Sequence, residues 1–505
     1  MLPLRGIRCN EAHTSDILTE QYIRTNSGMA FTIENSGEHI LETANTLPIA
    51  ATYDVLVCGG GTAGIPAAIA AAREGAKVGL VERYGFVGGV AAFSIMPCWH
   101  CLNDHHSGIL TEFAQRVGDF QQGPNPFSDN NHMEPETVKI VALTMLQEAG
   151  VDLRFHNWIA DVITEDSSVR GVVTETKSGR RALLAKTVID ATGDGDVCTR
   201  AGAQFSKGDN GKVQGMSLRF RIGHINFPRY FDWVWEHRSM YKNISREDWE
   251  SLREKAINGK AFFMLGDLSE FFKSHGGDAA HLPEKSYFNC SSIRPNELSL
   301  NATRVYHLDG TIEEDLSQGE VITRQQSYAI WRVLRSYVPG FEQSMIVETP
   351  AQVGVRETRE IVGDYTLTEE DCRRNATFED AVLTSKISFD VHDVSGYILE
   401  NVKGVVDIPY RCLLPKGLEN IIVVGRCMSC DHIANSTTRL QEVSHRTGQA
   451  GGTAAAMAAM QGITPRSLPV AQLQAKLQAN GFETSQRQRY LKSDMIAGLA
   501  SPGKV

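Results

Sequence analysis

The chain has 505 residues, of which 42% are hydrophobic and 22% are charged; this suits a folded protein of about three domains and excludes a disordered or fibrous chain. The formal net charge of −10 and the lack of a basic tract argue against nucleic acids and membrane surfaces as partners. Ten thinly spread cysteines, no signal-peptide core and no apolar run of about 20 residues predict a cytoplasmic protein. Whether the chain forms a homo-oligomer is left open.

The first regular pattern is a βαβ unit. The apolar run at residues 54–60 ends in glycines and predicts a buried parallel strand, residues 65–75 predict an alanine-rich helix, and residues 77–82 predict the next strand. Residues 135–150 then have the pattern of an amphipathic helix that ends at a glycine. Residues 151–192 alternate in short apolar runs, which predicts a meander of strands that returns to the first sheet.

Composition and periodicity divide the chain into five segments. Residues 1–50 are mixed and polar, and we expect an N-terminal extension. The alternation of strands and helices fills residues 51–205 and returns over residues 346–465. Residues 206–345 lose that rhythm and gain aromatic residues, which predicts a separate cap domain for the substrate. Residues 466–505 predict a helical tail.

A glycine-rich turn joins the first strand to the first helix. It matches G-x-G-x-x-G, and Glu82 ends the following strand. Gly59 permits the tight turn, Gly61 lets a pyrophosphate approach the backbone, and Gly64 lets the helix pack on the strand. The helix N-terminus faces the phosphates, and the Glu82 carboxylate accepts hydrogen bonds from ribose hydroxyls. The predicted cofactor contacts here are Gly59, Gly61, Thr62, Ala63, Gly64 and Glu82.

A second glycine pair follows shortly after the ribose acid. Arg83 is next to Glu82, and Gly88 and Gly89 come a few residues later. A pair of glycines allows a second close approach of the backbone to a long cofactor, whereas the alternative is an ordinary loop. The pattern favours a dinucleotide that extends past the first turn.

The sequence ERYGFVGG at residues 82–89, placed after this βαβ unit, is similar to the glutathione-reductase-type FAD-binding fold and resembles the FAD-dependent oxidoreductases. Residues 188–196, 352–359 and 420–426 are similar to later motifs of the same family. The resemblance implies an α/β fold, with a Rossmann-like FAD-binding domain of the glutathione-reductase type and an inserted α+β cap domain, and it implies FAD as the cofactor. It also implies that a helix beginning after Gly448 directs its first N–H groups at the flavin. The further FAD contacts that it implies are Ala160, Ala191, Thr192, Gly193, Asp194, Gly425, Arg426, Gly448 and Gln449, together with Arg83, Gly88 and Gly89.

The expected activity follows from the presence of a single dinucleotide motif. A second such motif would serve a nicotinamide nucleotide, so the resemblance implies that the substrate itself reduces the flavin. We expect a dehydrogenase or oxidase that transfers a hydride from a C–H bond bearing oxygen or nitrogen to flavin N5. Three alternatives stay open: an FAD-dependent reductase of an activated C=C bond, a thiol or metal electron carrier, and an FAD-binding scaffold without turnover.

Histidines are the expected proton acceptors, because the pKa of imidazole lies near neutrality. His100 follows the glycine pair, and His445 precedes Gly448; His432 is a further candidate. Arg356 completes the expected catalytic set, as an anchor for a substrate carboxylate or as an acid. Its alternative role is in ion pairs that hold a domain interface, together with the neighbouring charges Glu357 and Arg359, and Arg439 is a further candidate for binding a substrate anion or the flavin.

Two C-x-x-C pairs, Cys98 with Cys101 and Cys427 with Cys430, have three interpretations. They could bind zinc or an iron–sulfur cluster, form a redox-active dithiol, or pack as small buried side chains. We favour packing, because free cysteine mostly behaves as a small hydrophobic residue, and we expect no metal.

Overall fold

The computed structural model describes residues 22–24, 30–33, 40–42, 46–97, 99, 107–121, 133–237, 245–259, 261–267, 271, 274–275, 282–283, 287–292, 294–393, 396–400, 402 and 404–485. The chain divides into two compact units, residues 1–48 and residues 49–505. The first unit contains a small antiparallel sheet in the order β1-β2-β3. Its strands are β1 (Tyr22–Arg24), β2 (Ala30–Ile33) and β3 (Ile40–Glu42).

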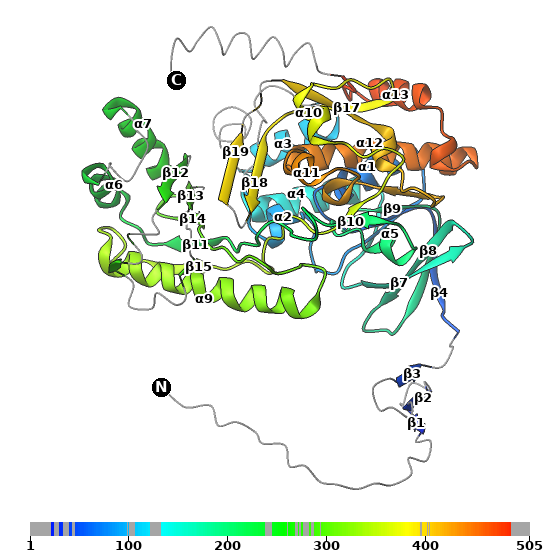
Figure 1. Ribbon diagram of the computed structural model, residues 1–505, viewed down its shortest axis with the longest axis horizontal. Coiled ribbons are helices and arrows are strands. Elements are labelled where there is room, and N and C mark those ends of the chain that lie inside the picture. The colour runs from blue at the N-terminus through cyan, green and yellow to red at the C-terminus, as the bar shows by residue number, and fades with distance from the viewer. Residues whose placement is uncertain are drawn as a thin grey trace. The chain divides into compact units, whose positions relative to one another are not determined.

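A largely parallel sheet forms the centre of the second unit, in the order β6-β5-β4-β9-β8-β7, with β21 beside the C-terminal part of β9 (Figure 1). The strands are β4 (Ile49–Cys58), β5 (Val78–Val81), β6 (Asp152–Arg154), β7 (Trp158–Glu165), β8 (Ser168–Glu175), β9 (Arg181–Asp190) and β21 (Ile421–Val423). The expected α/β fold with a parallel-rich sheet is confirmed, and β7, β8 and β9 form the expected meander.

The register of this sheet brings four strand ends to one edge. Cys58 at the end of β4 lies opposite Val81 of β5 and Asp190 of β9, and Asp190 also lies opposite Val423 of β21. The loops that leave the carboxyl ends of these parallel strands therefore start side by side. In open α/β sheets this edge is where ligands bind.

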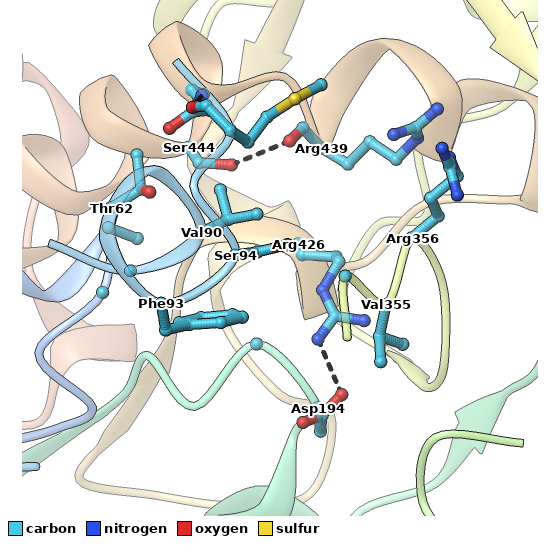
Figure 2. A pocket seen from close by; sticks show the side chains of 18 of the residues that line it. Thr62, Val90, Phe93, Ser94, Asp194, Val355, Arg356, Arg426, Arg439 and Ser444 are labelled. Atoms are coloured by element: carbon cyan, nitrogen blue, oxygen red, sulfur yellow. Dashed lines mark hydrogen bonds and ion pairs between the residues drawn. The ribbon is translucent and has the colours of Figure 1, made fainter. Parts of the chain in front are cut away.

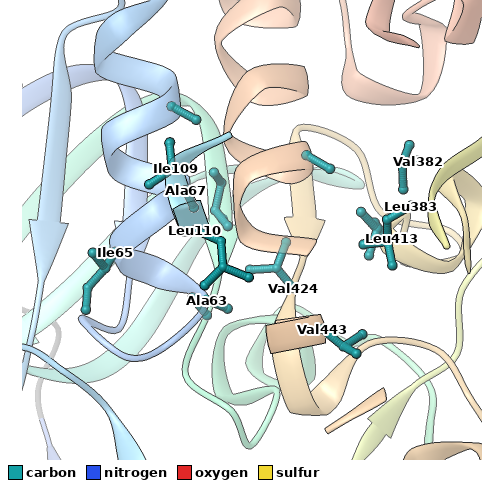
Figure 3. Packing of buried hydrophobic residues seen from close by; sticks show 14 of the residues in the cluster. Ala63, Ile65, Ala67, Ile109, Leu110, Val382, Leu383, Leu413, Val424 and Val443 are labelled. Atoms are coloured by element: carbon teal, nitrogen blue, oxygen red, sulfur yellow. The ribbon is translucent and has the colours of Figure 1, made fainter. Parts of the chain in front are cut away.

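Helices cover one face of the sheet and form the largest hydrophobic core. They are α1 (Gly64–Arg73), α3 (Ile109–Phe120), α4 (Pro135–Glu148) and α12 (Gln441–Gln461). The predicted helices at residues 65–75 and 135–150 correspond to α1 and α4. Figure 3 shows Ala67 where α1 packs against α12, and Val424 lies at the lower end of that contact in the view. On the opposite face, Leu56 and Val188 of the sheet pack in a second core with the short helix α5 (Asp196–Arg200).

A second, antiparallel sheet lies within residues 206–348 and has its own aromatic core (Figure 1). Its order is β12-β13-β14-β11-β15, and three helices accompany it. These elements are β11 (Phe220–Gly223), α6 (Phe227–Glu236), α7 (Arg246–Ile257), β12 (Ala261–Asp267), β13 (Tyr287–Ser292), β14 (Leu298–Asn301), α9 (Glu313–Tyr337) and β15 (Met345–Glu348). This is the segment that we expect to be the cap, and its domain boundaries stay a prediction.

Shorter elements complete the second unit. The helices are α2 (Val90–Phe93), α10 (Glu369–Arg373), α11 (His432–Thr438) and α13 (Val470–Ala479). The strand pairs are β10 (Phe205–Ser206) with β16 (Glu360–Ile361), β17 (Ala381–Lys386) with β20 (Val405–Pro409), and β18 (Phe389–Asp393) with β19 (Gly396–Glu400). Short 3-10 helices cover Tyr410–Leu413, Gly425–Cys427 and Pro465–Ser467. Within the described ranges, no helix has both the length and the hydropathy that a membrane span requires.

Candidate cofactor and substrate site

The turn between β4 and α1 has the backbone that its glycines predict. Gly59 has a φ of +109°, and a Cβ on it would lie 2.4 Å from the Ala191 carbonyl oxygen. A Cβ on Gly64 would lie 1.8 Å from the Gly59 carbonyl oxygen, so this position also requires glycine. Gly61 has only the Gly89 Cα within 4 Å of its virtual Cβ, at 3.6 Å, and it lines a cleft. The turn thus presents bare backbone to the cleft at the N-terminus of α1.

The Glu82 carboxylate lies beside this turn at the end of β5. It accepts hydrogen bonds from the backbone N–H groups of Gly60 at 2.8 Å and Tyr84 at 2.9 Å, and the residue is 9% exposed. Burial raises the pKa of the Glu82 carboxyl group, and the two N–H donors oppose that rise. A carboxylate oxygen has more than one acceptor site, so Glu82 keeps capacity for hydroxyl donors.

The second glycine pair closes against the first turn. Gly88 and Gly89 have φ values of +129° and +58°, and the Gly88 N–H donates to the Gly60 carbonyl oxygen at 3.0 Å. A Cβ on Gly89 would lie 2.5 Å from the Thr62 nitrogen. Glycine at position 89 therefore allows the two backbone segments to approach each other closely. Gly89 lines the cleft, and Gly88 does not.

The loops that follow β9 and β21 form the next wall of the cleft. The buried Asp190 carboxylate accepts from the backbone N–H groups of Val197 and Cys198 and from the Thr192 hydroxyl, which fixes the loop after β9. Burial raises the pKa of Asp190. Asp194 on the same loop forms an ion pair with Arg426 at 2.7 Å, shown as a dashed line in Figure 2. Two predicted cofactor residues thus hold each other across the two loops.

Helix α12 begins earlier than we expected. Its first residue is Gln441 rather than a residue after Gly448, so the expected position of its N-terminus is wrong. All of the residues from Gln441 to Thr447 except Val443 are polar, and all are buried; the Arg446 guanidinium, for example, donates to the Thr384 carbonyl oxygen at 2.6 Å. A search for apolar periodicity cannot find such a turn of helix.

Glycines of α12 serve helix packing. A Cβ on Gly448 would lie 2.0 Å from the Ala63 carbonyl oxygen, and a Cβ on Gly452 would lie 2.1 Å from the Ala67 carbonyl oxygen. The Gln449 side chain accepts from the Ile109 N–H at 2.8 Å and borders a different cleft. Gly448 and Gln449 therefore contact the protein rather than the cleft that the glycine turn lines.

One cleft of about 1280 Å³, counting the part that is open to solvent, gathers most of the predicted cofactor residues. The predicted site residues that line it are Gly61, Thr62, Ala63, Arg83, Gly89, Ala191, Thr192, Gly193, Asp194, Arg356, Gly425 and Arg426. Those that do not line it are Gly59, Gly64, Glu82, Gly88, Ala160, His445, Gly448 and Gln449.

The cleft is also lined by residues that the sequence reasoning missed. They come from segments distant in the chain, and only the sheet packing brings them together: Ser94, Ser217, Arg219, Asn301, Asp390 and Gln441. The Arg219 guanidinium donates to the Ser291 and Ser299 hydroxyls, and the residue is 2% exposed. No local spacing connects these residues, so only knowledge of the three-dimensional contacts could have found them.

Positive charge is concentrated at the end of the cleft that Arg356 and Arg439 line, opposite Thr62 in Figure 2; we call it the far end. Asp390 pairs with Arg439 at 3.1 Å and with His392 at 3.0 Å. Burial alone would raise the pKa of Asp390, but His392, Arg439 and Arg356 hold it well below its usual range. Burial and the neighbouring cations Arg304 and Arg439 lower the pKa of Arg356. Figure 2 shows the guanidinium groups of Arg356 and Arg439 next to each other.

The predicted histidines do not line the cleft within the described residues. The His445 ring is 2% exposed and packs against Trp99 and Phe113, with ring centroids 5.9 and 5.6 Å away. His100 lies outside the described residues. The His432 ring contacts Glu357 at 2.6 Å; burial opposes its protonation, but Glu357 and Asp393 raise the pKa of His432 to about 9.

The charges after Gly354 have different environments. Arg356 lines the cleft, whereas Glu357 is fully buried, accepts from the Gln214 N–H and pairs with His432. Arg359 pairs with Asp196 at 3.0 Å. The ion-pair role that we considered for this cluster therefore describes Glu357 and Arg359.

The second C-x-x-C pair is buried. Cys427 and Cys430 are at most 1% exposed and are free thiols, and burial raises the pKa of both well above the usual value. A protonated, inaccessible thiol is a poor nucleophile and metal ligand, which agrees with a packing role. In the part of the chain that the structure describes, no group of three or more His, Cys, Asp or Glu side chains has the arrangement of a metal site. Cys98 and Cys101 lie outside the described residues.

Sequence relatives of the chain include curated tRNA-modifying proteins, which it matches over part of their length. The tRNA uridine 5-carboxymethylaminomethyl modification enzyme MnmG of Bacillus velezensis is 28% identical over 212 residues, or 35% of this chain and 30% of that protein. The corresponding protein of Metamycoplasma arthritidis is 24% identical over 159 residues, or 28% of this chain and 25% of that protein. The chain thus spans less than a third of the length of either relative.

Solved structures with a similar arrangement are distant in sequence. A geranylgeranyl bacteriochlorophyll reductase-like protein from Thermoplasma acidophilum has a TM-score of 0.43 and 14% identity, covering 87% of this chain and 85% of that chain. The p-nitrophenol 4-monooxygenase PnpA from Pseudomonas putida has a TM-score of 0.37 and 12% identity, covering 88% and 86%.

A family profile covers most of the chain. The profile described as FAD dependent oxidoreductase matches residues 54–477, which include the glycine turn, Glu82 and the far end of the cleft. The bare backbone at Gly61 and the acceptor capacity of Glu82 fit the pyrophosphate and ribose of FAD. The chain therefore belongs to the family of FAD-dependent oxidoreductases, and it is a flavoprotein enzyme whose cofactor is FAD.

Proposed function

We propose that the chain is a dehydrogenase or oxidase of a small organic molecule. Bound FAD supplies the hydride acceptor for a C–H bond that bears oxygen or nitrogen. The observation that carries the proposal is that one cleft is lined both by the glycine turn and by Ser217, Arg219 and Asn301, which belong to the segment that we expect to be the cap. In this proposal the cofactor occupies the part of the cleft at the glycine turn, and the substrate occupies the part beside Ser217, Arg219 and Asn301.

The cofactor half belongs to residues 51–205 and 346–465, which we propose form a domain of the glutathione-reductase type. Thr62 and Ala63 at the start of α1 offer backbone N–H groups to the phosphates. Glu82 accepts from the ribose hydroxyls. Ala160 lies where the pairing of β7 with β8 shifts register, which leaves its backbone outside the regular ladder and suits a contact with adenine.

The cap half comes from residues 206–345. Ser217 and Arg219 precede β11, Asn301 ends β14, and all three line the cleft beside the proposed substrate. The proton of the substrate passes to a histidine in this proposal. His100 and His445 are the two candidates from the sequence; the His445 ring is 2% exposed and does not line the cleft, so His100 is the stronger candidate.

Anaerobic stopped-flow mixing tests the proposed function. Small alcohols, hydroxy acids, amines and amino acids are mixed with the FAD-loaded protein, and the flavin absorption is followed. We expect one class to bleach the flavin, and NADH and NADPH to bleach it slowly or not at all. Rapid, saturable bleaching by NADH or NADPH alone would contradict the proposal and favour a C=C reductase.

Variants of the two histidines test the proton acceptor. Replacing the true base, as His100→Asn or His445→Asn, should slow reduction by about a hundredfold or more while FAD stays bound. If neither variant changes the reduction rate, a histidine is not the proton acceptor.

A further inference from the structure

The far end of the cleft has more cationic than anionic groups. Arg356 and Arg439 line it, Arg304 is close enough to lower the pKa of Arg356, and Asp390 is the carboxylate that faces them. Figure 2 shows Arg356 and Arg439 on the opposite side of the cavity from Thr62, and therefore away from the N-terminus of α1 where the phosphates fit. The positive charge here serves something other than the pyrophosphate.

The partners of these arginines differ. Arg426 is neutralised by Asp194, and Arg439 by Asp390. Arg356 donates to the Gly215 carbonyl oxygen at 2.7 Å, and it forms no ion pair with a carboxylate of the described residues. Its guanidinium is thus held in place by a neutral acceptor and keeps its charge and remaining N–H donors for the cleft.

Asp390 does not compensate for Arg356. One of its oxygens contacts His392 and the other accepts from Arg439, so both are engaged. The charges of Asp390 and Arg439 offset each other, so the positive charge of Arg356, with the buried Arg304 close by, exceeds the negative charge at this end of the cleft. A half-buried cation without an anion gains from pairing with one, since the local dielectric constant is low.

Neutral donors complete the same end. Asn301 lines the cleft and accepts from the Ser217 hydroxyl through Oδ1, so its amide N–H₂ donors are not used in that hydrogen bond. A guanidinium with a fixed orientation and an amide donor are the groups that recognise a planar carboxylate.

We infer that the substrate carries a carboxylate, that Arg356 binds it, and that the Arg439–Asp390 pair orients Arg356 from the side. This inference rests on the proposed function and names the substrate class of that site. It also assigns Arg356 to substrate binding rather than to acid catalysis.

Ligand binding to the FAD-loaded protein tests the inference without turnover. Acetate and propionate, the uncharged analogues acetamide and propionamide, and inorganic phosphate are titrated by calorimetry and by the change in flavin absorption. We expect the carboxylates to bind at least about tenfold more tightly than the amides. We expect Arg356→Gln to remove that preference and Arg356→Lys to keep part of it, with FAD content unchanged. Arg170→Gln, an exposed arginine that pairs with Glu165, is the control for the change in net charge.

Several outcomes would overturn the inference. Equal binding of carboxylate and amide, no carboxylate binding, or tighter binding of phosphate would each exclude a carboxylate-specific site, and these measurements use the unchanged protein. Loss of FAD in folded Arg356→Gln would assign the arginine to the cofactor. If a substrate without a carboxylate bleaches the flavin, the proposed function stands and this inference fails. If carboxylates bind to the site but none of them bleaches the flavin, the carboxylate site stands and the proposed function fails.

Discussion

Replacement of Glu82 tests the cofactor assignment most directly. The carboxylate accepts two backbone N–H bonds, at 2.8 and 2.9 Å, and it is nearly buried, so Glu82→Lys removes both acceptors and adds a cation. Hydrogen bonds to a charged group contribute about 1.5–3 kcal/mol each, so the loss of one ribose contact together with the distorted turn costs about 3 kcal/mol of FAD binding. At about 1.4 kcal/mol per tenfold, the dissociation constant should rise by about a hundredfold or more.

The assay is titration of the apo-protein with FAD, followed by quenching of flavin fluorescence. Glu82→Gln keeps one oxygen acceptor and should bind FAD about tenfold more weakly. Glu148→Lys is the matched control, because that carboxylate is 49% exposed and pairs with Arg116, on the face of the sheet that the helices cover. A folded Glu82→Lys protein that binds FAD as tightly as the unchanged chain would refute the assignment of the turn.

Three further predictions concern stability and metal content. Gly452→Ala places a Cβ 2.1 Å from the Ala67 carbonyl oxygen, and this overpacking, which costs about 1–3 kcal/mol, should lower the urea midpoint of unfolding. Gly319→Ala is the control, because its Cβ meets a flexible side chain, and it should leave the midpoint unchanged or raise it. Equal midpoints for the two variants would contradict the tight helix contact. The pKa of His432 is raised from 6.5 to about 9 beside Glu357, so the stability from this pair is complete below pH 6.5 and is lost as the pH rises through about 9. Urea midpoints should fall over that range in the unchanged protein and fall less in His432→Gln; parallel curves would exclude the pair as the cause. Elemental analysis after dialysis against a chelator should find no stoichiometric zinc or iron, and one metal per chain would overturn the packing role of the cysteine pairs.

The sequence was informative where function depends on neighbours in the chain. The glycine spacing and Glu82 predict the turn, because a tight strand–turn–helix connection needs those residues within one βαβ unit. At the far end of the cleft the sequence indicated Arg356 and Arg439 but not their neighbours. Asp390 of β18 and Asn301 of β14 reach the same cleft as Arg439 only through the tertiary fold, and no spacing in the sequence encodes that meeting.

Buried polar residues explain the remaining error. The first two turns of α12 are rich in charged and polar side chains, which periodicity assigns to a surface or a loop. In the structure they are buried, and some of them form hydrogen bonds, as the Gln441 amide does by donating to the Met96 carbonyl oxygen. The helix therefore starts at a position that only its tertiary partners could indicate.

The contact between α1 and α12 has a consequence for how the chain is made. The two helices touch through Ala63 and Gly448, although most of the fold separates them in sequence. At roughly 5–20 residues per second, a ribosome releases α12 roughly tens of seconds after α1. During that interval the nascent chain exposes the small-residue face of α1, which is a surface for chaperones to cover. A chain whose translation stops before Gln441 carries the whole glycine motif and still lacks the helix that packs against it, so stalled synthesis should yield flavin-free protein.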